Sequence, residues 1–313
     1  MTETPTQAAA ADPDAAYGAE YYHSHCGDEP YTPDSANWVE FYNAIADEIV
    51  RSLRPTRVFD AGCAVGFLVA ALWDRNVEAH GRDISRYAIS QVRADVREYC
   101  SVGSIADPIE GDFDLILCIE VLEHMPEQEA WDAIAAMTSA APRILFSSTP
   151  ADFDEPTHVN VRPTIYWLGH FARAGFAPVV RHDATYLCPH AMLLERSTDG
   201  RAEQDLTAFA EIVRQRMGRA AQQRTARELT VKLDALNEVL ASERAARIAA
   251  DAEWRARLDA TERHSLALEA RLPTRAGKAA RRVLRVTWWT LTLQLPRRLR
   301  ARRATSSAAA EGR

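Results

Sequence analysis

The sequence predicts an α/β protein whose sheet is mainly parallel, followed by one long helix. Strand-like apolar runs alternate with helical patterns over roughly residues 38–195, and such alternation is typical of a parallel sheet covered by helices. Residues 202–272 contain no proline and are rich in Ala, Arg, Glu and Leu, as in a long helix. These patterns divide the chain into four segments: a disordered and aromatic start at 1–37, a domain at 38–198, a helical spacer at 199–272 and a tail at 273–313.

The first half of the domain is predicted to begin with a helix from Trp38 to near Pro55. Its apolar face would hold Trp38, Phe41, Ile45 and Ile49. A buried strand begins at Val58, a helix covers 67–73 and a second strand covers 77–84. Ser85 suits a helix cap, so the next helix is predicted from there through Val96, before a short strand at 99–102.

The second half has its clearest strand at Leu115–Ile119, an apolar run suited to a sheet buried on both faces. A helix after Pro126 leads to a strand at 143–147, and a helix over 163–174 is closed by Gly175. Residues 176–182 and 185–194 suit two closing strands.

A glycine turn joins the first strand to the helix after it, in the sequence DAGCAVG from Asp60 to Gly66. Such a turn lets a helix begin close to a bound nucleotide, because glycine reaches backbone angles that other residues avoid. A dinucleotide site would carry G-x-G-x-x-G, whereas this chain has Ala64 and an acid at Asp60. The acid favours a ligand with positive charge, and S-adenosylmethionine carries both an ammonium and a sulfonium.

Asp83 ends the second strand, where a carboxylate can accept hydrogen bonds from both hydroxyls of a ribose. The glycine motif, Asp83 and the segment 113–124 have the order and spacing of class I S-adenosylmethionine-dependent methyltransferases, and residues 38–195 resemble that family. The resemblance implies a Rossmann-like sheet of seven strands that ends in an antiparallel hairpin, with S-adenosylmethionine as cofactor. The cofactor-binding residues are then expected to be Asp60, Gly62, Cys63, Gly66, Asp83, Ile84, Ile119 and Glu120.

Glu120, Glu123 and His124 form an E-x-x-E-H pattern just after the strand that ends at Ile119. One helical turn would present all three side chains to the same side of the cofactor crevice. The pattern resembles that of the ubiquinone-pathway and small-RNA 3′-end methyltransferases, in which it holds a divalent ion such as Mg²⁺, and His158 would be the fourth ligand. It also resembles metal-free methyltransferases, in which case His124, beside Glu123, is the preferred general base.

Aromatic residues, histidines and a cysteine precede the domain: Tyr17, Tyr21, Tyr22, His23, His25, Cys26 and Tyr31. Aromatic faces attract a sulfonium, so this segment is interpreted as a lid over the cofactor, or else as an arm that covers exposed core. The spacing of its histidines and cysteine matches no zinc pattern with four ligands. Because the five cysteines show no C-x-x-C spacing, they are expected to be reduced in a cytoplasmic protein.

The helical spacer carries a short heptad seam of leucines, formed by Leu229, Leu233, Leu236 and Leu240. A homo-oligomeric coiled coil through 202–272 is expected, with a single solvated helix as the alternative. The tail at 273–313 holds eleven Lys and Arg residues against one acid, and its tryptophans stand between arginine clusters. Its apolar stretch is too short to span a bilayer, so residues 273–303 are predicted to lie on an anionic membrane surface, as a helix or a strand.

These features together indicate a methyltransferase that is cytoplasmic and peripheral on the inner face of the plasma membrane. The expected acceptor is a hydroxyl of a glycan or glycan-lipid, because the architecture resembles bacterial enzymes that methylate surface polysaccharide. A small phenol or quinone precursor, or a non-catalytic membrane scaffold, is the alternative. Nucleic acid is disfavoured, because the part that precedes the tail is acidic.

Overall fold

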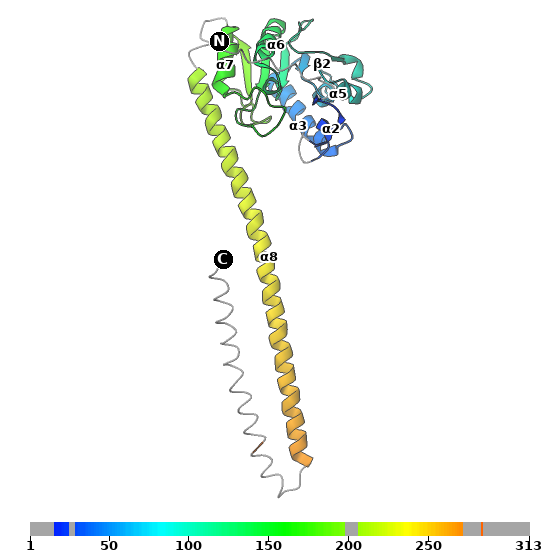
Figure 1. The fold of residues 1–313 in the computed structure, drawn as a ribbon, viewed down its shortest axis with the longest axis vertical. Helices are drawn as coiled ribbons and strands as arrows, with labels where there is room; N and C mark the ends of the chain where they lie inside the picture. Colours follow the sequence, from blue (N-terminus) through cyan, green and yellow to red (C-terminus); the bar gives the residue numbers. More distant parts are fainter. Residues whose placement is uncertain (1–15, 25–28, 198–205, 272–282, 284–313) are drawn as a thin grey trace, which may run out of the picture. The chain divides into compact units, whose positions relative to one another are not determined.

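The computed structural model describes residues 16–24, 29–197, 206–271 and 283 (Figure 1). The chain divides into two units, Met1–Thr225 and Ala226–Arg313, and the first unit holds the sheet. Seven strands form this sheet in the order β3-β2-β1-β4-β5-β7-β6. They are β1 (Arg57–Ala61), β2 (Glu78–Asp83), β3 (Cys100–Val102), β4 (Leu115–Ile119), β5 (Arg143–Ser147), β6 (Phe176–Pro178) and β7 (Met192–Arg196). Only β7 runs antiparallel to its two neighbours, so the predicted Rossmann-like, mainly parallel sheet is confirmed.

Helices cover both faces of the sheet, and alternate residues of the central strands pack into two different apolar clusters, one on each face. The helices are α2 (Ala19–Ser24), α3 (Ala36–Leu53), α4 (Phe67–Trp73), α5 (Arg86–Gln91), α6 (Glu127–Ala140), α7 (Thr164–Arg173) and α8 (Leu206–Arg271), with 3₁₀ turns at Arg97–Tyr99 and Leu122–His124. Leu117 and Leu145 pack with α3, α4 and α5, whereas Ile116 and Phe146 pack with α6, α7 and the start of α8. The carboxyl ends of the strands therefore lie between two covering layers, where parallel sheets bind their ligands.

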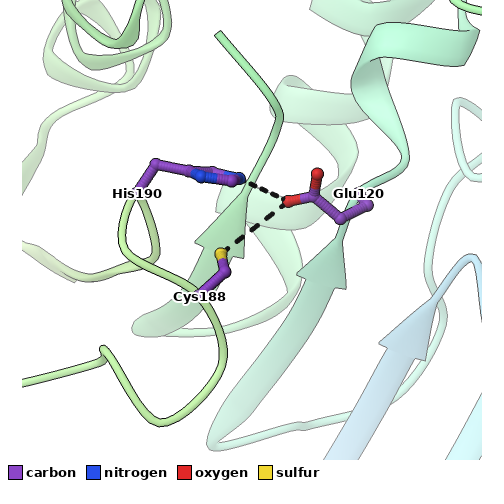
Figure 2. A group of neighbouring side chains, drawn as sticks. All are labelled: Glu120, Cys188 and His190. Atoms are coloured by element: carbon purple, nitrogen blue, oxygen red, sulfur yellow. Dashed lines mark hydrogen bonds and ion pairs between the residues drawn. The ribbon is translucent and has the colours of Figure 1, made fainter. Parts of the chain in front are cut away.

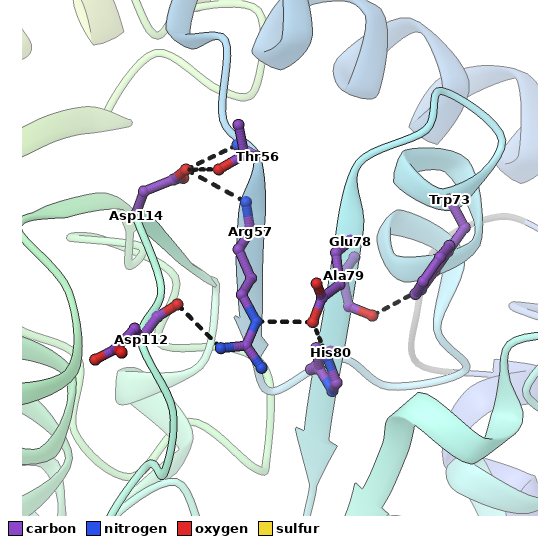
Figure 3. Close-up of polar contacts among 8 residues, drawn as sticks. All are labelled: Thr56, Arg57, Trp73, Glu78, Ala79, His80, Asp112 and Asp114. Atoms are coloured by element: carbon purple, nitrogen blue, oxygen red, sulfur yellow. Dashed lines mark hydrogen bonds and ion pairs between the residues drawn. The ribbon is translucent and has the colours of Figure 1, made fainter.

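A polar network holds the opposite, amino end of the sheet (Figure 3). Asp114 Oδ2 accepts hydrogen bonds from the Thr56 amide (2.8 Å), the Thr56 hydroxyl (2.6 Å) and the Arg57 amide (3.3 Å). Arg57 Nε donates to Glu78 Oε1 at 2.7 Å, and His80 Nε2 bonds to the same oxygen at 2.9 Å. These contacts join the beginnings of β1 and β2 to the segment that leads into β4, and so help to set the register of the three strands.

The beginning of α8 belongs to the domain and not to the spacer. Phe209 and Val213 are each only 1% exposed and pack in the cluster under α6 and α7. Arg216 lies 3.6 Å from Asp183, which precedes β7. The compact unit therefore continues to Thr225, whereas the sequence pattern placed the end of the domain at residue 198.

Further along α8, the leucines of the heptad seam are 40–60% exposed in the single chain. Within the described part of the chain, no helix is long and apolar enough to cross a membrane. The tail interpreted as membrane-binding, residues 273–313, lies outside the described residues apart from Val283.

Two elements end earlier than predicted. The helix capped by Ser85 ends at Gln91 and not at Val96, because the Val92 side chain turns inward beneath Gly66 and Arg97 donates to the Val92 carbonyl at 2.7 Å. The strand predicted at 176–182 ends at Pro178, since the chain then turns and the His182 amide bonds to the Val179 carbonyl at 3.0 Å.

Two further predictions of position are wrong. The strand expected at 185–194 begins only at Met192, because the segment 184–191 turns and contributes to the apolar cluster with α3 and α4 before pairing with β5 begins. Phe41 is 43% exposed, so the buried face of α3 is formed by Ile45, Ala46, Ile49 and Leu53 instead.

Candidate functional site

The glycine turn after β1 has a backbone that other residues adopt only with strain. Gly62 has φ = +87° and Gly66 has φ = +75°, and a Cβ at Gly62 would lie 2.5 Å from Val121 Cγ2. The amides of Gly62 and Cys63 both donate to the Arg82 carbonyl, at 2.8 and 3.1 Å. These two hydrogen bonds hold the turn against the end of β2. The positive φ and the nearness of Val121 leave room only for glycine at position 62.

Two buried carboxyl groups flank this turn. Asp60, at the end of β1, is 5% exposed, and burial together with the charge of Asp83 raises its pKa to about 7. Asp83 accepts hydrogen bonds from the Ala64 and Ser85 amides, each at 2.8 Å. These two bonds lower the pKa of Asp83, but burial has the larger effect and raises it. A ligand with positive charge beside Asp60 would stabilise its ionised form.

The aromatic segment ahead of the domain lies over the glycine turn. Tyr22 is buried against Val65, and the Ser85 hydroxyl donates to the Tyr17 carbonyl at 2.6 Å. The rings of Tyr17 and Tyr21 meet the His124 ring edge-on, with centroids 6.0 and 6.4 Å apart. This placement is what a lid requires, and His25 and Cys26 of the same segment lie outside the described residues.

Glu120 departs from the predicted arrangement at the end of β4. Its φ is +54°, so Glu120 does not belong to the short helical turn that holds Glu123 and His124, and the three side chains do not share one helical face. Its amide donates to the Ser147 carbonyl at 3.1 Å, which fixes this bend against the end of β5. Its carboxylate points toward the segment that precedes β7 (Figure 2).

There Glu120 Oε1 accepts a hydrogen bond from His190 Nε2 at 2.8 Å and faces Cys188 Sγ at 3.9 Å (Figure 2). Burial opposes a charge on His190, but its bonds with Cys188 and Glu120 outweigh burial and raise the pKa of His190 to about 10. Burial also disfavours the ionised form of Glu120, but the hydrogen bond and charge of His190 outweigh burial and lower the pKa of the Glu120 carboxyl. The two residues therefore form an ion pair.

Glu123 is fully buried in the next turn. Its Oε1 accepts a hydrogen bond from the Thr149 amide at 3.2 Å, whereas Oε2 has no hydrogen-bond partner among the described residues. Burial, reinforced by the charge of Glu120, raises the pKa of Glu123 to about 8. An unpaired buried carboxyl oxygen costs stability, so a cation or a hydrogen-bond donor is expected to satisfy it.

Two histidines lie beside Glu123 with their Nδ1 atoms engaged. The Thr157 hydroxyl donates to Glu155 Oε1 at 3.1 Å and lies 3.0 Å from His124 Nδ1, so it accepts the proton of that nitrogen. His158 Nδ1 donates to the Asp152 carbonyl at 2.8 Å. The Nε2 atom of each ring is left for a proton or a metal ion, and burial with the charge of His158 lowers the pKa of His124 to about 4.

The predicted metal ligands are therefore divided between two groups. Glu123, His124 and His158 offer ligand atoms within 4.8 Å of one another, whereas Glu120 belongs to a second such group with Cys188 and His190. Among the described residues, the Glu123 oxygen without a hydrogen-bond partner and the histidine Nε2 atoms fit a metal ion in the first group. One carboxylate with two imidazoles suits a transition metal better than Mg²⁺, which prefers oxygen ligands.

The other predicted cofactor residues lie at or just after the ends of β1, β2 and β4 and differ in burial. Cys63 is buried, and its Sγ would lie 2.7 Å from a Cβ at Gly81. Ile84, just after β2, is 38% exposed, and Ile119 is half-buried at the end of β4. The pairing of His190 with Glu120 was missed by sequence reasoning, because only the register of β7 brings residues 188–190 to β4. The four cysteines in the described ranges, Cys63, Cys100, Cys118 and Cys188, are free.

Comparisons with known proteins point to one domain class. Residues 59–141 match the family model described as "Methyltransferase domain". A ubiquinone biosynthesis O-methyltransferase of Alkalilimnicola ehrlichii is 30% identical over 105 residues, which cover 31% of this chain and 42% of that protein. A magnesium-protoporphyrin O-methyltransferase of Synechocystis is 31% identical over 98 residues, which cover 29% of this chain and 43% of that protein.

A crystal structure of the Synechocystis magnesium protoporphyrin IX methyltransferase with bound SAH aligns with a TM-score of 0.42 and 20% identity, over 56% of this chain and 96% of that chain. This chain spans less than half the length of the two curated relatives described above. The family match includes Asp60, Asp83 and His124. Residues 59–141 are therefore similar to a methyltransferase domain, in agreement with the class predicted from the sequence.

Proposed function

We propose that this chain transfers the methyl group of S-adenosylmethionine to an oxygen atom of a small-molecule acceptor. The observation that carries the proposal is the pair of buried carboxyls, Asp60 and Asp83, on either side of a turn that only glycine fits at position 62. Two neighbouring buried acids are costly unless a ligand satisfies them. The ammonium and sulfonium of the cofactor supply positive charge, and its ribose hydroxyls supply hydrogen-bond donors.

The sequence favoured a glycan acceptor, but the named relatives support a small-molecule acceptor instead. Both are O-methyltransferases, named for ubiquinone biosynthesis and for magnesium-protoporphyrin. The rings of Tyr17 and Tyr21 beside His124 also suit a planar acceptor, because aromatic faces stack on rings. A hydroxyl of a glycan or glycan-lipid is therefore the second choice.

His124 is the residue proposed to take the proton of the acceptor. Its ring is neutral at pH 7, and its Nε2 lone pair is free because Thr157 holds Nδ1. Methyl transfer to oxygen needs alignment of the acceptor and removal of one proton, and a neutral imidazole can do both. In the alternative arrangement, a divalent ion held by Glu123, His124 and His158 would occupy this Nε2 atom and would itself lower the pKa of an acceptor hydroxyl, so that His124 would be a ligand and not the base.

The cofactor site is tested by titrating the full-length chain with S-adenosylhomocysteine in a calorimeter. Wild type is expected to bind in the micromolar range, and Asp83→Asn to bind at least about tenfold more weakly, because one good charged hydrogen bond contributes 1.5–3 kcal/mol. Asp114→Asn is the matched control, since Asp114 also accepts several hydrogen bonds but lies at the amino end of the sheet. Equal affinities in wild type and Asp83→Asn would contradict the proposed site.

The acceptor is tested with labelled S-adenosylmethionine and three acceptor pools: small phenols and quinone precursors, porphyrin carboxylic acids, and a glycan-lipid extract. Label in either of the first two pools is expected. His124→Asn should abolish turnover and leave the affinity for S-adenosylhomocysteine unchanged. Label confined to the glycan-lipid pool would reverse the order of the two acceptors, and loss of cofactor binding by folded wild type would favour the non-catalytic scaffold.

We also propose that α8 makes the chain a homo-oligomer and that residues 273–303 bind an anionic membrane surface on the cytoplasmic side. The exposed leucines of α8 support the first statement, and the basic and tryptophan-rich composition of the tail supports the second. Sedimentation velocity of the full chain tests the oligomer. Co-sedimentation with vesicles that contain phosphatidylglycerol, compared with phosphatidylcholine alone, tests the membrane contact, and equal pelleting with both would contradict it.

A further inference from the structure

A cysteine, a histidine and a glutamate converge where the chain enters β7. Cys188 and His190 precede β7 by four and two residues, and the pairing of Phe146 with Met192 places them beyond the carboxyl end of β5. Glu120 reaches them from the end of neighbouring β4, because its backbone bend turns the side chain this way (Figure 2). The three residues come from segments that are about 70 positions apart in the chain.

The distances between their donor atoms are close to those between the ligand atoms of a tetrahedral zinc site, one shorter and one longer. His190 Nε2 lies 2.8 Å and Cys188 Sγ lies 3.9 Å from Glu120 Oε1, and the three atoms lie within 4.8 Å of one another. With zinc bonds of about 2.3 Å to sulfur and 2.0–2.1 Å to nitrogen or oxygen, adjacent ligand atoms in a tetrahedron lie about 3.3–3.6 Å apart. Shifts of less than about 1 Å in the side chains would therefore complete the coordination.

We propose that Glu120, Cys188 and His190 bind a zinc ion, at a site separate from Glu123, His124 and His158. A thiolate with an imidazole selects zinc over magnesium or calcium, which take oxygen ligands. Three protein ligands leave a fourth position open to water or to a substrate oxygen. The Glu120 side chain is 38% exposed, so the ion can reach the site from solvent.

Zinc binding must break the ion pair between His190 and Glu120 and must remove the proton of the Cys188 thiol. The zinc ion gains bonds to Cys188 Sγ, His190 Nε2 and a Glu120 oxygen, while the Cys188 thiol and the His190 imidazolium each release one proton to the buffer. The net charge of the three side chains and the ion falls to zero, which suits a half-buried position. The inference does not depend on methyl transfer, because every measurement below reports metal binding directly.

The test titrates metal-free, full-length protein with Co²⁺ as a spectroscopic substitute, and then with Zn²⁺. Wild type is expected to bind one equivalent at this site, with near-ultraviolet absorption from a cobalt–thiolate bond that Zn²⁺ removes by displacement. Cys188→Ser should abolish that absorption, and His190→Ala should weaken binding at least about tenfold. Cys100→Ser and Cys26→Ser are the matched controls and should leave the spectrum unchanged.

Three results would overturn the proposal. The first is the absence of thiolate absorption in wild type, which is decisive even if a variant fails to fold. The second is its persistence in Cys188→Ser, which would assign the ion to another cysteine. The third is cobalt binding that lacks thiolate absorption and is lost in His158→Gln, which would place the only metal at Glu123, His124 and His158. Far-ultraviolet circular dichroism checks the fold of each variant.

Discussion

Replacing Gly62 by alanine tests the claim that the cofactor turn is built around the absence of a side chain. The backbone at Gly62 has φ = +87°, which costs a residue with a Cβ about 1–2 kcal/mol. The added Cβ would also lie 2.5 and 2.9 Å from the two γ carbons of Val121, and overpacking of this kind costs about 1–3 kcal/mol. Gly62→Ala should therefore lower the free energy of unfolding by about 2–5 kcal/mol.

Two further variants separate these two costs. Gly175 has φ = +81° with no atom within 4 Å of its added Cβ, so Gly175→Ala should show the backbone cost alone, about 1–2 kcal/mol. Val121→Ala removes the overlapping γ carbons, so the double variant with Gly62→Ala should recover about 1–3 kcal/mol relative to the sum of the single changes.

Urea unfolding of the full chain, followed by tryptophan fluorescence, measures these free energies. Gly62→Ala should also weaken S-adenosylhomocysteine binding, whereas Gly175→Ala should not, because Gly175 follows α7 away from the turn. Equal destabilisation by Gly62→Ala and Gly175→Ala, together with additive behaviour of the pair Gly62→Ala and Val121→Ala, would refute the steric argument.

Four other substitutions test the same structure. Asp60 keeps its proton to about pH 7 when folded but loses it near pH 4 when unfolded, so the unliganded protein should lose stability as pH rises through this window; Asp60→Asn should remove that loss in thermal unfolding and weaken S-adenosylhomocysteine binding, and an unchanged pH profile would contradict the reasoning. Phe209→Ala should cost about 3–5 kcal/mol in urea unfolding because its ring is buried; exposed Leu236→Ala should cost within about 0.5 kcal/mol in a monomer and more, with a concentration-dependent midpoint, in an oligomer. Ser85→Ala removes the cap of α5 and should cost about 1 kcal/mol; it also loses the bond to the Tyr17 carbonyl, so chymotrypsin should cleave there sooner, and unchanged cleavage would count against the lid.

The regular elements were largely readable from the sequence, because their signals are local. The predicted bounds of α4, β4 and β5 agree with the structure, since each is a continuous apolar run with a clear start and end. Errors occurred where a distant residue decided the outcome. Val92 ends α5 because it packs beneath Gly66, and β7 begins late because its pairing with β5 begins only at Met192.

The candidate site divides in the same way. Composition and spacing by themselves determined the Asp60 to Gly66 turn, the second acid at Asp83 and the E-x-x-E-H motif, because these features are encoded in short stretches. Only the tertiary structure decided that this motif separates, with Glu120 joining Cys188 and His190 while Glu123 stays with His124 and His158. The physical reason is that one left-handed residue at position 120 and the register of β7 set these contacts, and neither leaves a periodic mark in the sequence.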